Sequence, residues 1–299
     1  MNRIGIIIAS LVFLYSCGKS NEQYDASGTF EATEIMVSSE ASGKILQFGA
    51  QEGELLQPGN EIVLIDTLQL FLKKQQLLSS INALQSRRPE VNKQIAAVQQ
   101  QIATAKTEKQ RAENLVKASA ANQKMLDDIN AQIVVLEKQL AAQKSTLDIS
   151  NRGISDDVAT MEIQVAQLDD QLLKCRIASP INGTLLVKYA QVGELAMPGK
   201  ALFKVADMES MILRAYITSD QLTQLKIGQT VKVFADFGEG TREYSGTISW
   251  ISGKAEFTPK TIQTKDERAN LVYAVKIAVK NDGYLKIGMY GQVKLTMDN

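Results

Sequence analysis

The sequence contains no histidine, which removes the commonest general base and the commonest zinc ligand from a chain of 299 residues. Its two cysteines are too few for a metal cluster, and neither a Gly-x-x-x-x-Gly-Lys-Ser loop nor a Gly-x-Ser-x-Gly elbow occurs. The formal net charge is zero, so there is no basic footprint for nucleic acid. Acidic pairs such as Asp127-Asp128 lie in segments with a helical pattern, where solvated helix faces are expected. We therefore expect no enzymatic activity, no cofactor and no metal ion.

The N-terminus has the pattern of a lipoprotein signal. Arg3 precedes an apolar run that ends in Leu14-Tyr15-Ser16-Cys17, and this run is too short to span a bilayer as a helix. We predict a signal peptide over residues 1–16, an acylated Cys17 and a flexible tether over 17–28. No Asp follows Cys17, which favours the periplasmic face of the inner membrane. The alternative is an ordinary secretory signal in which Cys17 is incidental.

Once Cys17 is lipidated, Cys175 is the only thiol left, so no internal disulfide is possible. Cys175 follows an apolar helical pattern, and we expect a small buried side chain.

A gapless internal repeat relates two segments that lie 140 residues apart. Ala50-Gln51 recurs as Ala190-Gln191, and apolar runs follow each copy at the same offset. Glycine and proline at matching places predict short strands joined by tight turns. The shared turn residues are Gly43, Gly53, Pro58 and Gly59 in the first copy and Gly183, Gly193, Pro198 and Gly199 in the second. The repeat predicts the two halves of one flattened β-sandwich.

Between the two copies, apolar or small residues alternate at steps of four and three, as the seam of a coiled coil requires. The pattern predicts an antiparallel helical hairpin over residues 67–176, with its tip near 117–122. Each arm would extend about 75 Å at about 1.5 Å per residue. The seam positions are Val91, Ile95, Val98, Ile102, Ala105, Ala112 and Val116 in the first arm, and Leu126, Ile129, Ile133, Leu136, Leu140, Gln143, Leu147, Ile154, Val158, Met161, Val165, Leu168 and Leu172 in the second.

Pro89 and Gly153 lie opposite each other in this hairpin when the two arms are aligned about residue 121. Proline removes a backbone donor and clashes with the preceding helical turn, and glycine weakens the helix opposite. We expect a kink or a short break there. The alternative is that Pro89 opens a separate helix, which would give a shorter bundle of four segments.

The C-terminal third changes to strand-like alternation. The pattern predicts a small β-barrel over residues 208–258 and a further β domain over 259–297 that pairs with residues 29–34. The predicted fold is therefore α+β, elongated and multi-domain: a long antiparallel coiled-coil hairpin inserted in a split sandwich, followed by a barrel and a second β domain built from both chain ends.

The split sandwich, over residues 35–66 and 177–207, resembles a biotinyl/lipoyl carrier domain. The hairpin occupies the place of the modifiable lysine tip, so the resemblance implies no prosthetic group. With a lipid anchor, split lipoyl-like domain, hairpin, barrel and membrane-proximal β domain in this order, the whole chain resembles the periplasmic adaptor (membrane fusion protein, HlyD-like) family of tripartite exporters.

This resemblance implies contact between the hairpin tip and a TolC-like outer-membrane channel. The family has Arg, then Leu four residues on, then Ser seven after that; here Arg111 and Leu115 match, Asn122 replaces Ser, and Asp127 falls where an acidic residue is frequent. Each also has a purely structural interpretation. Asn122 would only cap a helix, Leu115 would only staple the turn, and Arg111 would only pair with Asp127 or Asp128.

The resemblance further implies a homo-oligomer, of six copies in keeping with the family, that joins an inner-membrane transporter to the channel, with loops near Gln51 and Gln191 lining the conduit. The long hairpin favours an ABC-type transporter and export of a small molecule or other substrate. The alternatives are an adaptor of a proton-driven (RND-type) pump, a non-conducting periplasmic scaffold lipoprotein, and a carrier-domain enzyme subunit. The missing lysine tip and the export signal argue against the last.

Overall fold

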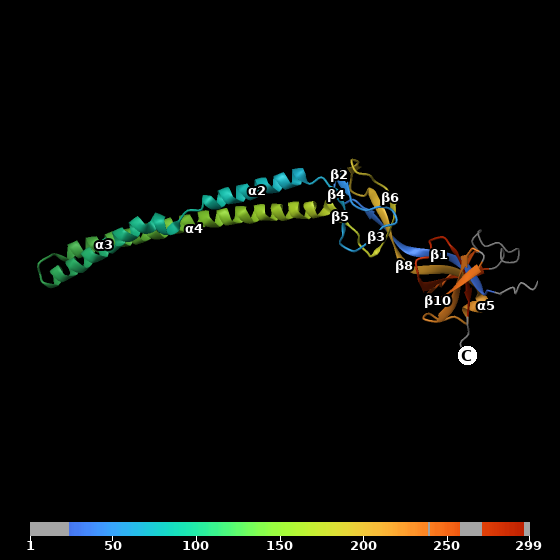
Figure 1. Ribbon diagram of the computed structural model, residues 1–299. Coiled ribbons are helices and arrows are strands. Elements are labelled where there is room, and N and C mark those ends of the chain that lie inside the picture. Colours follow the sequence, from blue (N-terminus) through green and yellow to red (C-terminus); the bar gives the residue numbers. More distant parts are fainter. Residues whose placement is uncertain (1–23, 239, 258–270, 296–299) are drawn as a thin grey trace, which may run out of the picture.

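The computed structural model describes residues 24–238, 240–257 and 271–295. A helical hairpin extends from one end of a small β-sandwich, and a β-barrel lies beyond the sandwich's other end (Figure 1). The strands are β1 (Ala26–Ser38), β2 (Gly43–Phe48), β3 (Leu55–Leu56), β4 (Glu61–Ile65), β5 (Arg176–Ala178), β6 (Gly183–Lys188), β7 (Leu195–Ala196), β8 (Ala201–Thr218), β9 (Thr230–Phe237), β10 (Gly240–Ile251), β11 (Glu256–Phe257), β12 (Leu271–Lys280) and β13 (Tyr290–Lys294). The helices are α2 (Leu68–Ser86), α3 (Val91–Lys117), α4 (Gln123–Lys174) and α5 (Ser219–Leu222).

The sandwich has the two-fold relation that the repeat predicts. Strand β3 pairs with β6, and β7 pairs with β2, in matching registers. The loop contacts match as well: the Gly53 N–H donates to the Leu185 carbonyl at 2.8 Å, and the Gly193 N–H donates to the Ile45 carbonyl at 2.9 Å. The two donors lie 140 residues apart, and so do the two acceptors. Each half of the sandwich therefore bonds the loop of the other half in the same way.

Four of the predicted turn glycines adopt a left-handed backbone. The φ angles are 87° at Gly53 and 95° at Gly193, and 81° at Gly59 and 86° at Gly199. Residues with a Cβ adopt this region only at a cost. These four glycines are therefore explained by repeated backbone conformation, whereas Gly43 and Gly183 begin strands β2 and β6 and do not lie in turns.

The sandwich encloses one hydrophobic core drawn from both halves. Its buried residues are Ile45, Ala50, Leu56, Ile62, Val63, Ile65, Cys175, Ile177, Leu185, Ala190, Ala196, Leu202, Phe203 and Val205. Ser39 and Ser179, another pair at the 140-residue offset, are also buried, and each hydroxyl donates at 2.7 Å to the carbonyl two residues on. The sequence reasoning missed this pair because it looked for glycine and apolar matches.

The hairpin has a first arm of two helices, α2 and α3, and a second arm that is the single helix α4. Ion pairs between the arms show the antiparallel alignment: Lys74 of α2 pairs with Asp169, and Lys106 of α3 pairs with Glu137 at 2.9 Å. All four side chains are partly exposed, and such pairs contribute little to stability.

The predicted break occurs in one arm only. Residues 87–90 interrupt the first arm around Pro89, whereas α4 continues through Gly153. Proline prevents continuation of the helix ahead of it, but one glycine costs a helix only about 1 kcal/mol. The expected break at this height is found at Pro89, whereas α4 has no break at Gly153, and the hairpin is not a bundle of four segments.

The buried residues of α3 and α4 lie on the predicted seam, and α2 adds one buried residue outside the predicted positions. They are Ile81 in α2, then Ile95, Val98, Ile102, Ala105 and Ala112 in α3, and Ile133, Leu147, Val158 and Leu168 in α4. The remaining seam positions of the second arm are partly buried. Each helix therefore buries a narrow stripe and exposes the rest of its surface.

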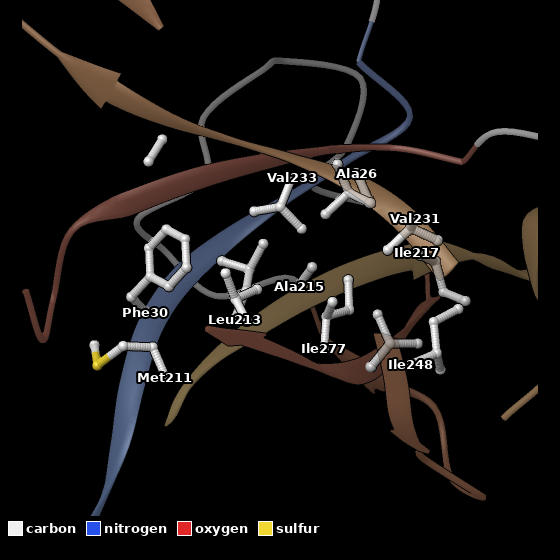
Figure 2. Close-up of a cluster of buried hydrophobic side chains, with 14 of the residues drawn as sticks. Ala26, Phe30, Met211, Leu213, Ala215, Ile217, Val231, Val233, Ile248 and Ile277 are labelled. Atoms are coloured by element: carbon white, nitrogen blue, oxygen red, sulfur yellow. The ribbon is translucent and has the colours of Figure 1, made fainter. Parts of the chain in front are cut away.

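At the other end, the strand order β12-β10-β9-β13-β1-β8 closes on itself because β12 also pairs with β8. Figure 2 shows side chains of the core inside this barrel. The cluster includes Phe30 from β1, Leu213 from β8 and Ile277 from β12. We expected residues 208–258 to form one domain and residues 259–297 to form another with residues 29–34. Strands from all three ranges instead share one core. The barrel closes only when β12 enters between β8 and β10.

The barrel contains a second repeat that the sequence reasoning missed. Leu225-Lys-Ile-Gly228 precedes β9 and Leu285-Lys-Ile-Gly288 precedes β13. Both leucines are buried, and the two glycines have φ angles of 89° and 85°. The shared conformation indicates that the barrel, like the sandwich, contains structurally matched parts.

Candidate functional site

The hairpin tip is a short turn between α3 and α4 with a defined backbone. The Ser119 N–H donates to the Val116 carbonyl at 3.0 Å, and the Ala120 N–H donates to the Leu115 carbonyl at 2.9 Å. These two bonds form a Schellman motif, in which the residue after the helix cap is left-handed. Ser119 has that conformation, with φ 53°.

Asn122 caps the returning helix. Its backbone is extended, and its side-chain Oδ1 accepts the Met125 N–H at 3.0 Å. This satisfies one of the donors that a helix start leaves without a partner. The capping interpretation is therefore confirmed, and the Oδ1 atom of Asn122 is already engaged within the protein.

The other predicted tip residues lie within about two helical turns of the turn that connects α3 and α4. Leu115 is 44% exposed. Arg111 lies one turn earlier on the same face of α3 and is exposed. Asp127 accepts a hydrogen bond from the Gln123 side-chain amide at 3.2 Å. Within the described residues Arg111 forms no ion pair, so the predicted pairing with Asp127 or Asp128 is not present.

Three further tip residues were missed by the sequence reasoning. Met125 is 46% exposed on the first turn of α4, slightly more than Leu115. Lys117 and Lys124 flank the turn, and neither ammonium has a carboxylate within ion-pair distance among the described residues. The signal available for Met125 was its position directly before Leu126, where the heptad pattern of the second arm begins. The tip thus combines apolar side chains with unpaired cations.

Cys175 lies at the other end of α4, in the sandwich core. Its thiol donates to the Gln171 carbonyl at 3.3 Å, and its side chain is fully buried. Burial raises the pKa of the Cys175 thiol, and the negative charge of Asp66 raises it further. Both effects disfavour the reactive thiolate, consistent with a packing role.

The glutamines expected to line a conduit lie on exposed loops of the sandwich. Gln51 and Gln191 occupy matching places, and each carbonyl accepts the N–H of the glutamate three residues on, at 3.1 and 3.2 Å. Gln51 also donates its own N–H to the Glu54 carboxylate at 2.9 Å. Their side chains are accessible from solvent.

Two open crevices lie where the sandwich meets its neighbours. One, of about 440 Å³, lies between the sandwich and the barrel and is lined by Asp207 and Asn281 among others. The other, of about 650 Å³, lies at the hairpin base and is lined by Asp66 and Lys174 among others. Among residues 24–238, 240–257 and 271–295, no group of three or more His, Cys, Asp or Glu is placed to hold a metal ion.

None of the helices in the described part of the chain combines the length and apolar composition that crossing a membrane requires. Cys17 and the signal sequence lie outside the described residues.

No protein-family model matches the chain. A UPF0194 membrane protein of Yersinia pseudotuberculosis serotype O:3 (strain YPIII) is 24% identical over 324 aligned residues, covering 97% of each chain. The UPF0194 membrane protein YbhG of Salmonella gallinarum (strain 287/91 / NCTC 13346) is 33% identical over 123 residues, which cover 41% of this chain and 37% of the relative. The sequence is therefore similar to membrane proteins along nearly its whole length.

Two solved structures have a fold similar to that of this chain. MacA from Actinobacillus actinomycetemcomitans superposes with a TM-score of 0.57 and 21% identity, covering 90% of this chain and 76% of MacA. The membrane fusion protein Spr0693 from Streptococcus pneumoniae R6 gives 0.55 and 17%, covering 91% and 98%. The resemblance inferred from the order of parts in the sequence is confirmed: this chain has the fold of the membrane fusion proteins.

Proposed function

We propose that this protein is a periplasmic adaptor that connects an inner-membrane transporter to a TolC-like outer-membrane channel. It would serve export of a small molecule or other substrate across a Gram-negative envelope, without catalysing a reaction. The hairpin tip, through Arg111, Leu115, Asn122 and Asp127, would contact the channel.

The separation of the tip from the two chain ends carries this proposal. Asp25 and Leu295, near the two ends of the described chain, are joined in the barrel by a hydrogen bond from the Leu295 N–H to the Asp25 carboxylate at 2.7 Å. The tip lies at the opposite extreme (Figure 1). Helix α4 alone, with 52 residues, extends about 78 Å. A rod of this length suits a link between two partners that are far apart.

The proposed anchor is an acyl chain on Cys17 in the inner membrane. Tyr24, the first described residue, follows Cys17 closely in the sequence, and the chain between them reaches at most about 25 Å when extended. The barrel would then lie close to the membrane, next to the transporter. The Cys17→Ser variant should move from the membrane fraction to the soluble periplasm; unchanged membrane attachment would exclude the lipid anchor.

The proposed assembly is a ring of several copies, six in keeping with the family, with coiled-coil hairpins side by side. Three large apolar residues on the outside of α4, Val135, Ile149 and Ile163, are exposed and spaced by two heptads. Such spacing keeps them on one face of a supercoiled helix. Lateral packing of copies would bury this stripe. We favour an ABC-type transporter because the hairpin is long, with the RND-type pump as the alternative.

In-cell photo-crosslinking from the tip tests the central claim. Position 120 is preferable to position 122 for the probe, because Ala120 contributes only backbone to the turn whereas the Asn122 side chain caps α4. We expect a tip probe to capture an outer-membrane channel, identified by mass spectrometry. A probe at the exposed mid-rod residue Ser145 is the matched control and should capture neighbouring copies instead.

The scaffold alternative gives the opposite pattern. If the probe at position 120 captures only copies of this chain or another periplasmic protein, the protein is a non-conducting scaffold and the adaptor proposal fails. The Leu115→Asp variant adds a second criterion, because a charge there should abolish channel capture while membrane attachment and thermal unfolding stay unchanged.

A further inference from the structure

Ser119 is the only non-glycine residue with a positive φ angle in the part of the chain that the structure describes. The other left-handed positions are all glycines, including those of both repeats. Serine at the apex of the hairpin is an exception that the turn itself does not require, since glycine is the usual residue at this place of a Schellman motif.

The Ser119 hydroxyl forms no hydrogen bond with other described residues, and the side chain is exposed. Serine and asparagine side chains in turns commonly bond to nearby backbone groups. Asn122 does so, whereas Ser119 does not. The left-handed backbone is therefore supported by the backbone bonds of the turn but by no bond from the Ser119 side chain, and non-glycine residues in this conformation cluster at functional places.

The surroundings of Ser119 are suited to a protein partner. Leu115 and Met125 expose apolar surface on the two sides of the turn. Lys117 and Lys124 carry positive charges without carboxylate partners among the described residues. A partner that presents an apolar recess with carboxylates at its rim would match this arrangement in shape and charge.

We propose that Ser119 is a specificity-determining contact of the tip, whose hydroxyl bonds a polar group of the outer-membrane channel, with Met125, Lys117 and Lys124 as neighbouring contacts. The inference rests on the adaptor function proposed above. It adds Ser119 to the polar contacts of the tip, where the Oδ1 atom of Asn122 is engaged in capping and only the side-chain amide N–H groups of Asn122 remain for the channel.

The test compares variants of the full-length, membrane-attached protein that carry the photo-probe at position 120. Ser119→Gly removes the hydroxyl but suits the left-handed backbone, so the hairpin should be at least as stable. Loss of one hydrogen bond should lower capture of the channel by about three- to tenfold. Ser145→Ala removes a hydroxyl from the exposed mid-rod surface, away from the tip, and should leave capture unchanged.

Two further variants separate the role of the hydroxyl from that of the turn. Ser119→Asn tolerates the left-handed backbone and keeps a polar group, so it should recover most of the capture. Lys124→Glu should lower capture more than Lys138→Glu, an exposed charge reversal away from the tip.

The two ways of failing are distinguishable. If the probe captures no channel while Ser119 is intact, the adaptor function fails and this inference fails with it. If the unsubstituted protein and the Ser119→Gly variant capture the channel equally, within about twofold, the adaptor function stands and Ser119 is only a turn residue.

Discussion

In the sandwich, Ile45, Leu185 and Val205 are fully buried in a cluster drawn from several strands, whereas in the hairpin a residue such as Ile133 belongs to a narrow buried stripe on one helix. The sandwich therefore has a core, and the hairpin has a line of contacts. A core couples its residues in three dimensions, so disturbing one site affects the whole unit. A line of contacts can open at one height while the rest remains closed.

The difference also explains the roles of glycine. In the sandwich, most glycines occupy positions that suit no other residue: four have a positive φ, and Gly183 is approached closely by the backbone of Ala206. In the hairpin, Gly153 has open space around the position of a Cβ atom and an ordinary helical backbone. The same residue type is required in one region and dispensable in the other.

The largest effect is expected from Gly183→Ala in the sandwich. An added Cβ would come within 2.5 Å of the Ala206 carbonyl oxygen and 2.9 Å of the Val205 side chain. Because backbone has to move, we expect a loss of about 3 kcal/mol in the free energy of unfolding. Hydrogen exchange of the sandwich amides, including Leu185, measures it. Gly49→Ala, with its nearest atom at 3.8 Å, is the control; equal losses would contradict the close-approach explanation.

The next effect is expected on the rod from a pair of adjacent substitutions in α4. Ile133 is 7% exposed and Val134 is 54% exposed. Ile133→Ala should cost about 2 to 3 kcal/mol of local stability, while Val134→Ala should cost almost nothing. Hydrogen exchange should show faster opening of the hairpin amides around residue 133 only. Equal acceleration in the sandwich would mean that the two regions unfold as one unit.

A smaller effect is expected at the tip. Asn122→Ala removes the side-chain acceptor of the Met125 N–H and should cost about 1 kcal/mol, seen as faster exchange in the first turn of α4. Asn122→Ser should restore protection. If Asn122→Ala has no effect on exchange, the observed cap does not stabilise the helix.

The smallest effect is a gain. Gly153→Ala fills open space on a continuous helix and should stabilise the hairpin by about 0.5 to 1 kcal/mol. Thermal unfolding followed by circular dichroism measures the change. Gly199→Ala in the sandwich, where φ is 86°, should destabilise instead. If both substitutions stabilise the protein, or both destabilise it, the proposed difference between the two regions is wrong.

The sandwich could be predicted from the sequence because its turns require glycine and proline at fixed places, and the requirement appears twice. The seam could be predicted because burial of one stripe imposes a seven-residue period. The barrel was harder: its closure depends on β12 entering between β8 and β10, and pairing between distant strands leaves no local pattern. Its short repeat around Gly228 and Gly288 was overlooked for a different reason, since only four residues match in a row.

The tip was predicted in part. Arg111, Leu115, Asn122 and Asp127 were chosen by resemblance, and the cap at Asn122 followed from residue type. The left-handed Ser119 could not be foreseen, because serine seldom adopts that conformation. The continuity of α4 through Gly153 could not be read from the sequence, since packing against the partner arm outweighs the modest helix penalty of a single glycine.

Because α4 is uninterrupted and the first arm is not, only α4 sets the distance between the sandwich and the tip. Each heptad in α4 adds about 10 Å between the sandwich and the tip, and no gap in this helix can take up a mismatch. The first arm has such a gap at residues 87–90, where extra or missing residues can be accommodated without shifting the tip. The number of residues in α4 therefore determines the length of the hairpin, and changes of length in the first arm can be accommodated at residues 87–90.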